Sequence, residues 1–190
     1  FAWSEPTTAE TVRQDEERVR EFVSDLHAAG VETVFPYMCN QTMGGDPEKR
    51  TGMWWYHDRR DEYDVIPAIE VDPIDWLQRE PDGHLHFNYP YRFPLVNPPI
   101  RFAPCPNNPH WHDWLQSCAR RLASYGYDGT FVDNNIIACY CEHCERQFPE
   151  FLHEEYTPEQ LRQRYGDDLD SLRMTTRGSR IHWAQEQPGY

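Results

Sequence analysis

Residues 129–144 read GTFVDNNIIACYCEHC and join a strand-like run to a group of closely spaced cysteines. The run 129–135 has the character of a strand, and Cys139, Cys141 and Cys144 follow it. In a Cys-x-Cys-x-x-Cys spacing, three sulfurs converge from one turn and the start of a helix, which is an arrangement of metal ligands. The stretch therefore predicts a zinc site directly beyond the end of a strand.

Helix-like and strand-like segments alternate on both sides of this stretch. The predicted helices are 7–30, with Thr7 and Glu10 as a capping box, 108–126, a segment kinked or restarted near Pro149, and 157–166. The predicted strands are 31–38, expected to be buried on both faces, 84–89 and 129–135. Such alternation is typical of a parallel sheet with helices outside, either a barrel or an open doubly wound sheet. We expect an α/β fold of the (β/α)8 TIM-barrel type, and a partial barrel because few strands are visible.

The composition predicts one folded domain over residues 1–190, with an acidic surface. Hydrophobic residues make up 38% and aromatic residues 14%, which is enough for a core. The net charge of −14 repels phosphate backbones and anionic lipids, so we expect no nucleic acid and no membrane as partner. The sequence contains no run of about 18 apolar residues, so we expect no membrane span. The first residues resemble neither an initiator segment nor a signal peptide and read as the interior of a longer protein.

Six cysteines favour metal binding over disulfides, because disulfide-dense chains are usually small and poor in core. This reading implies a reducing, cytoplasmic compartment. The fourth ligand must lie outside the 139–144 cluster. Cys105, in a proline-flanked loop before a helix, is the best candidate, and Cys39, Cys118 and His143 stay open. Four thiolates would close the zinc site and make it structural, since catalytic zinc keeps a position for water.

Polar residues at the predicted strand ends form a candidate substrate site. Parallel α/β folds place active sites at the carboxyl ends of their strands, where Asp133, Asn134 and Asn135 end the clearest strand. The alternative is that Asp133 only caps a turn. Other candidates for binding are the strand-end residues Asn40 and Asn88, with Trp54, Trp55 and His57 from a long aromatic-rich loop at 39–81. Amides and aromatic rings suit the hydroxyls and C–H faces of sugars.

Between residues 100 and 155 the sequence resembles the β-galactosidases of glycoside hydrolase family 42. The resemblance is carried by Ala103–Pro109, Tyr125–Asn135, Cys139–Cys144 and Phe148. Those proteins are TIM-barrel enzymes in which a cysteine before the helix joins a Cys-x-Cys-x-x-Cys cluster on zinc. The resemblance therefore implies Cys105, together with Cys139, Cys141 and Cys144, as the zinc ligands.

The resemblance breaks at the residue expected to transfer a proton. The family pattern has Asn-Glu at the end of the fourth strand, and this chain has Asn134-Asn135. Asp133 is the only carboxylate at this strand end, so it is the candidate catalytic residue, as in barrels that act on α-glucans. The second carboxylate of the usual pair would lie beyond Tyr190.

These observations predict a glycoside hydrolase acting on a neutral carbohydrate, with a structural zinc ion. Because Asn135 replaces the family's glutamate, a carbohydrate-binding barrel without catalysis is one alternative. A zinc-stabilised interaction module is another, and a catalytic zinc hydrolase is the weakest. Homo-oligomerisation stays open.

Overall fold

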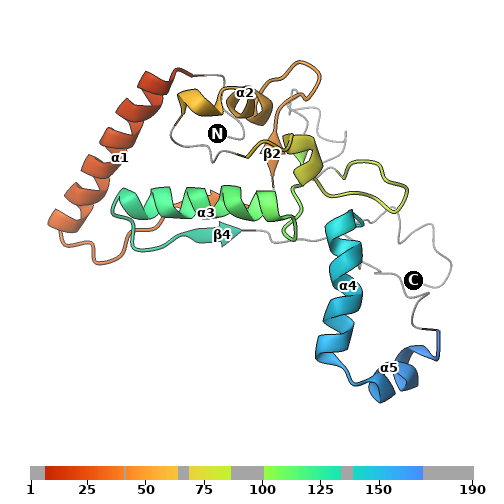
Figure 1. The fold of residues 1–190 in the computed structure, drawn as a ribbon. Coiled ribbons are helices and arrows are strands. Elements are labelled where there is room, and N and C mark those ends of the chain that lie inside the picture. Colours follow the sequence, from red (N-terminus) through yellow and green to blue (C-terminus); the bar gives the residue numbers. More distant parts are fainter. Residues whose placement is uncertain (1–6, 41, 64–68, 87–100, 134–138, 169–190) are drawn as a thin grey trace, which may run out of the picture. The chain divides into compact units, whose positions relative to one another are not determined.

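The computed structural model of the chain describes residues 7–40, 42–63, 69–86, 101–133 and 139–168 (Figure 1). The chain divides into two compact units. The first comprises residues 1–77 and 87–135, and the second comprises residues 78–86 and 136–190. Asn88, Asn134 and Asn135, three of the predicted binding residues, lie outside the described residues.

Helix α1, Ala9–Ala28, confirms the first predicted helix, although its N-cap is Thr8 rather than Thr7. The Thr8 hydroxyl accepts a hydrogen bond from the backbone N–H of Thr11, which satisfies one of the free donors at a helix start. Val12 and Val23 are buried on the inner side of the helix. Val12 and Val23 therefore mark the packed face of α1, whereas Phe22 is exposed.

Helix α3, Pro109–Ser124, begins where the sequence predicts, with Asn108 as N-cap and a proline at its first position. Trp111 and Trp114 are buried on one side of it. A polar cluster ties α3 to α1: the Glu16 carboxylate accepts from the Arg121 guanidinium at 2.5 Å and from the Tyr125 hydroxyl at 2.8 Å. Glu16 therefore links α1 to the last turn of α3 and to its C-cap residue.

The described strands form two separate two-stranded sheets. Strand β1, Tyr37–Cys39, pairs in parallel with β4, Phe131–Asp133, and Cys39 lies opposite Asp133. Strand β2, Met43–Gly44, pairs antiparallel with β3, Arg101–Phe102. Backbone hydrogen bonds from Asp128 to Val34 and from Phe131 to Pro36 continue the parallel pairing upstream.

The expected (β/α)8 TIM-barrel type is wrong, since no barrel is present among the described residues. That expectation assumed that each apolar run pairs in parallel with the next. Only β1 and β4 do so, over three residues each, whereas Arg101–Phe102 runs antiparallel to β2 and Leu85 forms an antiparallel bridge with Arg79. Such local antiparallel pairing interrupts the succession of parallel strands that a barrel needs.

The predicted burial of the first strand on both faces is also wrong. Phe35 and Tyr37 are exposed, and so are Phe131 and Val132 in and around the paired strand. An apolar run records a preference for burial, but the layer that covers a strand comes from other parts of the chain. The parallel pair is therefore much more accessible than the strands of a typical parallel sheet.

The segment 39–81, expected to be a long loop, contains helical structure and most of the core of the first unit. Its elements are α2, Met53–Asp58, and the 3-10 helices η1, Arg60–Glu62, and η2, Pro73–Trp76. The largest fully buried side chains of this core are Trp54, Tyr56, Trp76, Phe102 and Trp111. The indole N–H groups of three buried tryptophans find acceptors: Asp72 for Trp54, the Val71 carbonyl for Trp76 and the Asn40 carbonyl for Trp111.

The second unit contains a hairpin and two helices. In the hairpin 78–86, His86 N–H donates to the Gln78 carbonyl and Glu80 N–H donates to the His84 carbonyl. Helix α4, Glu142–Glu155, runs through Pro149 without a break, and α5, Pro158–Tyr165, begins with a capping box of Thr157 and Gln160. Leu152 of α4 and Leu161 of α5 are buried apolar residues of this unit.

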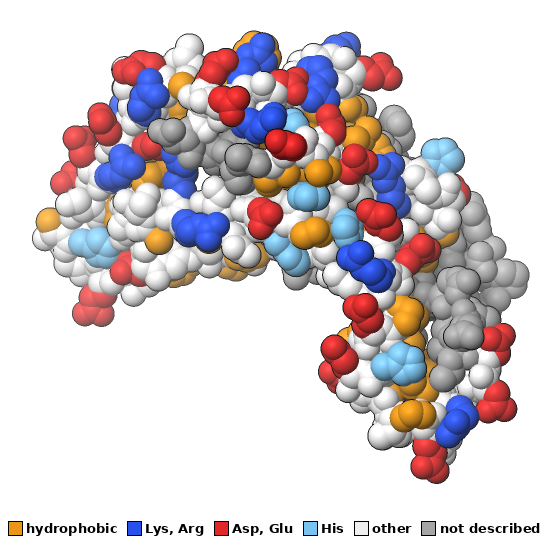
Figure 2. Space-filling view, viewed as in Figure 1, with side chains coloured by type: hydrophobic (Ala, Val, Ile, Leu, Met, Phe, Trp, Pro, Cys, Tyr) orange, Lys and Arg blue, Asp and Glu red, His pale blue; other side chains and the backbone are white. Residues whose placement is uncertain are grey.

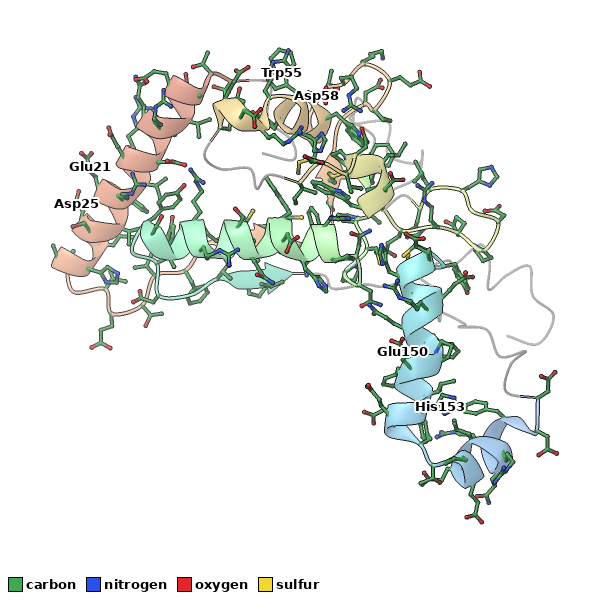
Figure 3. The ribbon with its side chains drawn as sticks, viewed as in Figure 1. Glu21, Asp25, Trp55, Asp58, Glu150 and His153 are labelled. Atoms are coloured by element: carbon green, nitrogen blue, oxygen red, sulfur yellow. The ribbon has the colours of Figure 1, made fainter. Side chains whose placement is uncertain are left out.

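The helix surfaces are strongly charged. In the first unit, acidic and basic side chains are interspersed over the face drawn in Figure 2. Glu21 and Asp25 project from α1, and Glu150 and His153 project from α4 (Figure 3), and all four are exposed. Within the described part of the chain, none of the helices is both long enough and apolar enough to cross a membrane.

Candidate metal centre

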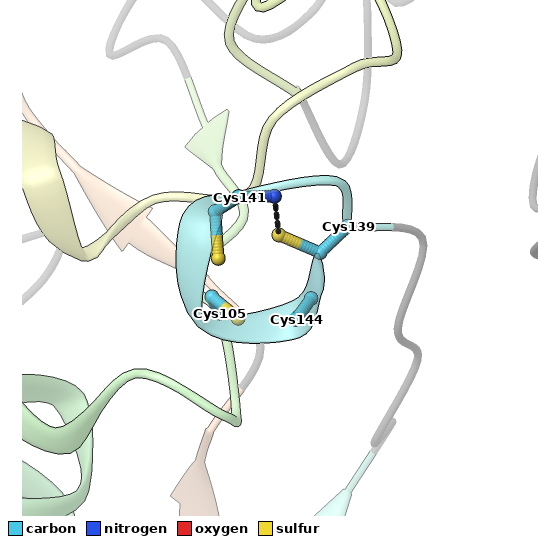
Figure 4. Close-up of side chains that lie close together, drawn as sticks. All are labelled: Cys105, Cys139, Cys141 and Cys144. Carbon is cyan, nitrogen blue, oxygen red and sulfur yellow. Dashed lines mark hydrogen bonds between the residues drawn. The ribbon is translucent and has the colours of Figure 1, made fainter. Parts of the chain in front are cut away.

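Four buried cysteines lie together in the structure (Figure 4). The sulfurs of Cys105, Cys139, Cys141 and Cys144 are all within 4.8 Å of one another. All four side chains are buried, and none of them is in a disulfide. This group can hold a metal ion.

Local backbone hydrogen bonds hold Cys105 in its turn. Its N–H donates to the Trp76 carbonyl at 2.8 Å, and its carbonyl accepts from the N–H of Asn108 at 3.0 Å. The preceding Pro104 forms a β-bridge with Leu77. Because Asn108 is also the N-cap of α3, the start of that helix and the position of the Cys105 backbone are set together.

The hairpin 78–86 positions Cys139. The N–H of Arg79 donates to the Cys139 sulfur at 3.4 Å, and the N–H of Tyr140 donates to the Arg79 carbonyl at 2.9 Å. A second donor to the same sulfur is the N–H of Cys141, at 3.3 Å (Figure 4). Backbone N–H groups that donate to a sulfur stabilise its thiolate form and orient it toward a metal.

Cys141 and Cys144 belong to the start of helix α4. Cys141 is the N-cap and Cys144 is the third helical residue, so the two side chains lie one turn apart at the same end of the helix. The N-terminal end of a helix carries partial positive charge, which favours thiolates there. Sequence spacing and helix geometry together explain why these two sulfurs meet.

The other candidate ligands do not belong to this group. Cys39 and Cys118 are half-buried and lie outside it among the described residues. Burial raises the pKa of the Cys118 thiol to about 11, which disfavours the thiolate that a metal needs. The His143 ring nitrogens lie 3.6 Å from a Glu142 oxygen and 3.3 Å from the Arg146 guanidinium. Its imidazole therefore interacts with its own helix rather than with the sulfurs.

The spacing of the sulfurs suits a single ion. Four thiolates at about 2.3 Å from one metal in a tetrahedron lie about 3.8 Å apart. The observed upper bound of 4.8 Å needs only small side-chain rotations to reach that arrangement. The donor set is four sulfurs, which is the chemistry of ions such as zinc that bind soft ligands.

The predicted strand-end residues are only partly described. The parallel register places Asp133 opposite Cys39, so the backbones of Asp133 and Asn40 lie at the same end of the β1–β4 pair. Asn40 is buried, and its carbonyl accepts from the indole of Trp111. The roles of Asp133 and Asn40 stay predictions.

Three residues expected to bind sugar come from helix α2 and face largely inward. Trp54 is fully buried and donates to Asp72 at 2.8 Å. His57 is buried, and its Nε2 lies 3.0 Å from the Ile69 carbonyl. Trp55 is half-buried, with the Arg59 guanidinium 3.4 Å from the centre of its ring. Of the three rings, that of Trp55 is the most accessible.

Two features of the sites have no signal in the sequence. The Arg79 N–H that donates to the Cys139 sulfur is a backbone group, which any residue would supply. Arg50 contacts both Asp58 and Asp72, residues separated by irregular spacings along the chain. These contacts hold α2 and η2 together and depend on the folded chain, so no local pattern predicts them.

We compared the chain with known protein families, curated proteins and solved structures. No family model matches the chain, and neither a curated protein nor a solved structure matches it.

Proposed function

We propose that the protein binds one zinc ion through the thiolates of Cys105, Cys139, Cys141 and Cys144, and that the ion stabilises the fold. The observation that carries this proposal is the mutual proximity of four buried sulfurs. Without a metal, four adjacent buried thiols would contribute little more than apolar packing. With zinc, the thiolates gain both charge compensation and strong bonds.

A structural role follows from the number of protein ligands. Zinc in proteins is usually tetrahedral, and four cysteines leave no position for water. Catalytic zinc sites keep one position open for water or substrate. The metal therefore would fasten the Cys105 turn and the start of α4 rather than activate a reactant.

Metal content and visible spectroscopy test the proposal. Protein purified without chelators should contain one zinc per chain, and replacement by Co2+ should produce the intense visible absorption of a tetrahedral thiolate site. The Cys105→Ser and Cys139→Ser variants should each lose that absorption or bind the metal far more weakly than the unmodified protein.

The chain offers matched controls for this experiment. Cys39→Ser and Cys118→Ser also remove one sulfur each, but from residues outside the group, so metal content should be unchanged. A reduced, correctly folded protein that binds no zinc would refute the proposal. Equal loss of metal in the control variants would refute the ligand assignment.

As a second candidate function, we propose that the protein acts on or binds a neutral carbohydrate. The observation that favours it is the parallel register, which places Asp133 and Asn40 at the same strand end. Carboxylate and amide side chains both suit the hydroxyl groups of a sugar. Of the three rings predicted to bind sugar, those of Trp54 and His57 are buried, and that of Trp55 is the most accessible to a sugar.

Assays of glycoside hydrolysis and of carbohydrate binding distinguish an enzyme from a protein that only binds carbohydrate. If the chain or its parent protein hydrolyses a glycoside, Asp133→Asn should abolish turnover while leaving binding largely intact. Binding without hydrolysis would select the non-catalytic form. Absence of both would refute the carbohydrate function and would leave the zinc proposal untouched.

A further inference from the structure

We propose that the four-cysteine site is also a peroxide-sensitive switch, in which Cys141 and Cys144 form a disulfide and the metal is released. This inference rests on the proposed binding of zinc and concerns how the occupancy of that site is regulated. It assigns different chemical roles to the four sulfurs, which a purely structural site would not require.

Exposure distinguishes Cys141 from the other members of the group. Cys141 is 8% exposed, whereas Cys105 and Cys139 are 0% exposed and Cys144 is 1% exposed. An oxidant in solution must reach a sulfur before it can react, and oxidation of cysteine follows both thiolate character and access. Because all four residues would be thiolates on the metal, we expect Cys141, the most exposed residue of the group, to react first.

The start of helix α4 supplies the partner thiol. Cys141 at the N-cap and Cys144 three residues later form a Cys-x-x-Cys pair in the first turn, a spacing used for reversible disulfides. Their sulfurs are no more than 4.8 Å apart, and side-chain rotation must bring them to the bonding distance of about 2.05 Å.

Cys139 is less suited to attack an oxidised Cys141. Its sulfur accepts hydrogen bonds from the N–H groups of Arg79 and Cys141, which hold it in place and withdraw charge from it. Only one residue separates it from Cys141, and a disulfide across so short a span distorts the backbone. Cys144 is therefore the resolving thiol.

The reaction balances with hydrogen peroxide as the oxidant. The Cys141 thiolate attacks peroxide, the O–O bond breaks, and a sulfenic acid and hydroxide form. The Cys144 thiolate then attacks that sulfur and displaces a second hydroxide, which gives the disulfide. Two thiolates lose two electrons to one peroxide, and two protons from solvent convert the hydroxides to water.

Release of the metal follows from the loss of two ligands. Disulfide sulfurs carry no negative charge and bind zinc poorly, so only Cys105 and Cys139 would remain as thiolates. Two ligands cannot hold zinc against the full set of water molecules that compete for it. Reduction of the disulfide would restore all four ligands and allow the ion to return.

The test uses zinc-loaded protein that carries Cys39→Ser and Cys118→Ser, so that every remaining thiol belongs to the site. Metal content is measured first. Hydrogen peroxide is then added below one equivalent, released zinc is followed with a chromogenic chelator, and disulfide-linked peptides are identified by mass spectrometry. We expect loss of one zinc and two thiols for each peroxide consumed, a Cys141–Cys144 linkage, and recovery on reduction and zinc addition.

The outcomes separate failure of the proposed switch from failure of the proposed zinc binding. Protein without zinc before peroxide is added overturns both. Protein that binds zinc but retains it under peroxide, or that first links a different pair of cysteines, overturns the switch alone. In Cys141→His, which keeps a metal-binding side chain at this position, peroxide should release zinc more slowly. If that variant fails to fold, the linkage formed in the four-cysteine protein decides the question.

Discussion

Gly52 shows how much one residue constrains the turn into helix α2. Its φ is +60°, and an added Cβ would lie 2.3 Å from the Gly44 carbonyl oxygen and 2.5 Å from the Gly45 Cα. Backbone atoms cannot move aside as a flexible side chain can. Glycine is therefore required at this position by both its dihedral angle and its close contacts.

Substitution at Gly52 should destabilise the protein more than substitution at an open glycine. Gly30 also has positive φ, at +92°, but no atom lies within 4 Å of its Cβ position. Gly30→Ala should cost about 1–2 kcal/mol from the dihedral angle alone. Gly52→Ala should cost about 1–3 kcal/mol more through overpacking. Urea unfolding followed by circular dichroism measures both, and equal costs would contradict the close approach at Gly52.

The Asp72 carboxylate accepts hydrogen bonds from three groups where α2 and η2 meet. It accepts from the Trp54 indole at 2.8 Å, the Ile74 N–H at 2.9 Å and the Arg50 guanidinium at 2.6 Å. Burial alone would raise the pKa of its carboxyl group. The hydrogen bonds from Ile74, Arg50 and Trp54, with the charge of Arg50, outweigh that effect and lower the pKa.

The lowered pKa of Asp72 predicts a loss of stability in acid. Its contribution is fully present above the unfolded-state pKa of about 3.9 and is lost as pH falls through the lower folded-state value. Asp72→Asn should cost about 1–2 kcal/mol at pH 7, with a smaller difference from the unmodified protein below about pH 4. Urea unfolding across pH measures this. The exposed Asp61→Asn is the control, and an equal effect there would contradict the assignment.

At the scale of elements, the helices show why capping residues predict boundaries well. Asn108 caps α3 through a hydrogen bond from His110 N–H at 2.9 Å, and Thr157 caps α5 through the reciprocal contacts with Gln160. These contacts span two or three residues, so they can be read from sequence. The strands lack such local signals, and their partners lie far along the chain.

Removal of the cap should lower the free energy of unfolding more at Asn108 than at Thr157, because only Asn108 is buried. Asn108 is 1% exposed, and its amide also donates to the Asp75 carbonyl at 2.8 Å. Asn108→Ala should cost about 2–3 kcal/mol, since it removes both the cap and the hydrogen bond from this buried amide to the Asp75 carbonyl. The exposed Thr157→Ala should cost about 1 kcal/mol. Chemical unfolding compares them, and a larger cost at Thr157 would contradict this account.

At the scale of the whole molecule, the proposed zinc ion links stability to metal concentration. A ligand that binds only the folded state raises the free energy of unfolding by about 2.7 kcal/mol at 100 times its dissociation constant. Chelation should therefore lower Tm, and zinc should restore it. Cys144→Ser should show no such response, and Cys118→Ser should respond like the unmodified protein. A Tm that is independent of zinc in the unmodified protein would contradict a structural role.

The cysteine spacing illustrates how far the sequence alone leads. Cys139, Cys141 and Cys144 lie within six residues, and a turn followed by a helix start brings their sulfurs together locally. Cys105 is different, because it lies 34 positions before Cys139, and only the folded chain places its sulfur beside the others. The position of Cys105 in a loop before a helix made it the best candidate for the fourth ligand. Its proximity to the other three sulfurs depends on the tertiary structure.

Sequence alone predicts helices α1, α3 and α5 and the caps of α3 and α5, because helical hydrogen bonds and capping contacts join residues only a few positions apart. Tertiary structure decided strand pairing, burial and the charged contacts of Arg50. Strand pairing carries a loop-closure cost and depends on which distant segment is available, so the run 31–38 could not specify its partner or its covering layer. For that physical reason the parallel pair was predictable in part, whereas the expected barrel was not what the chain forms.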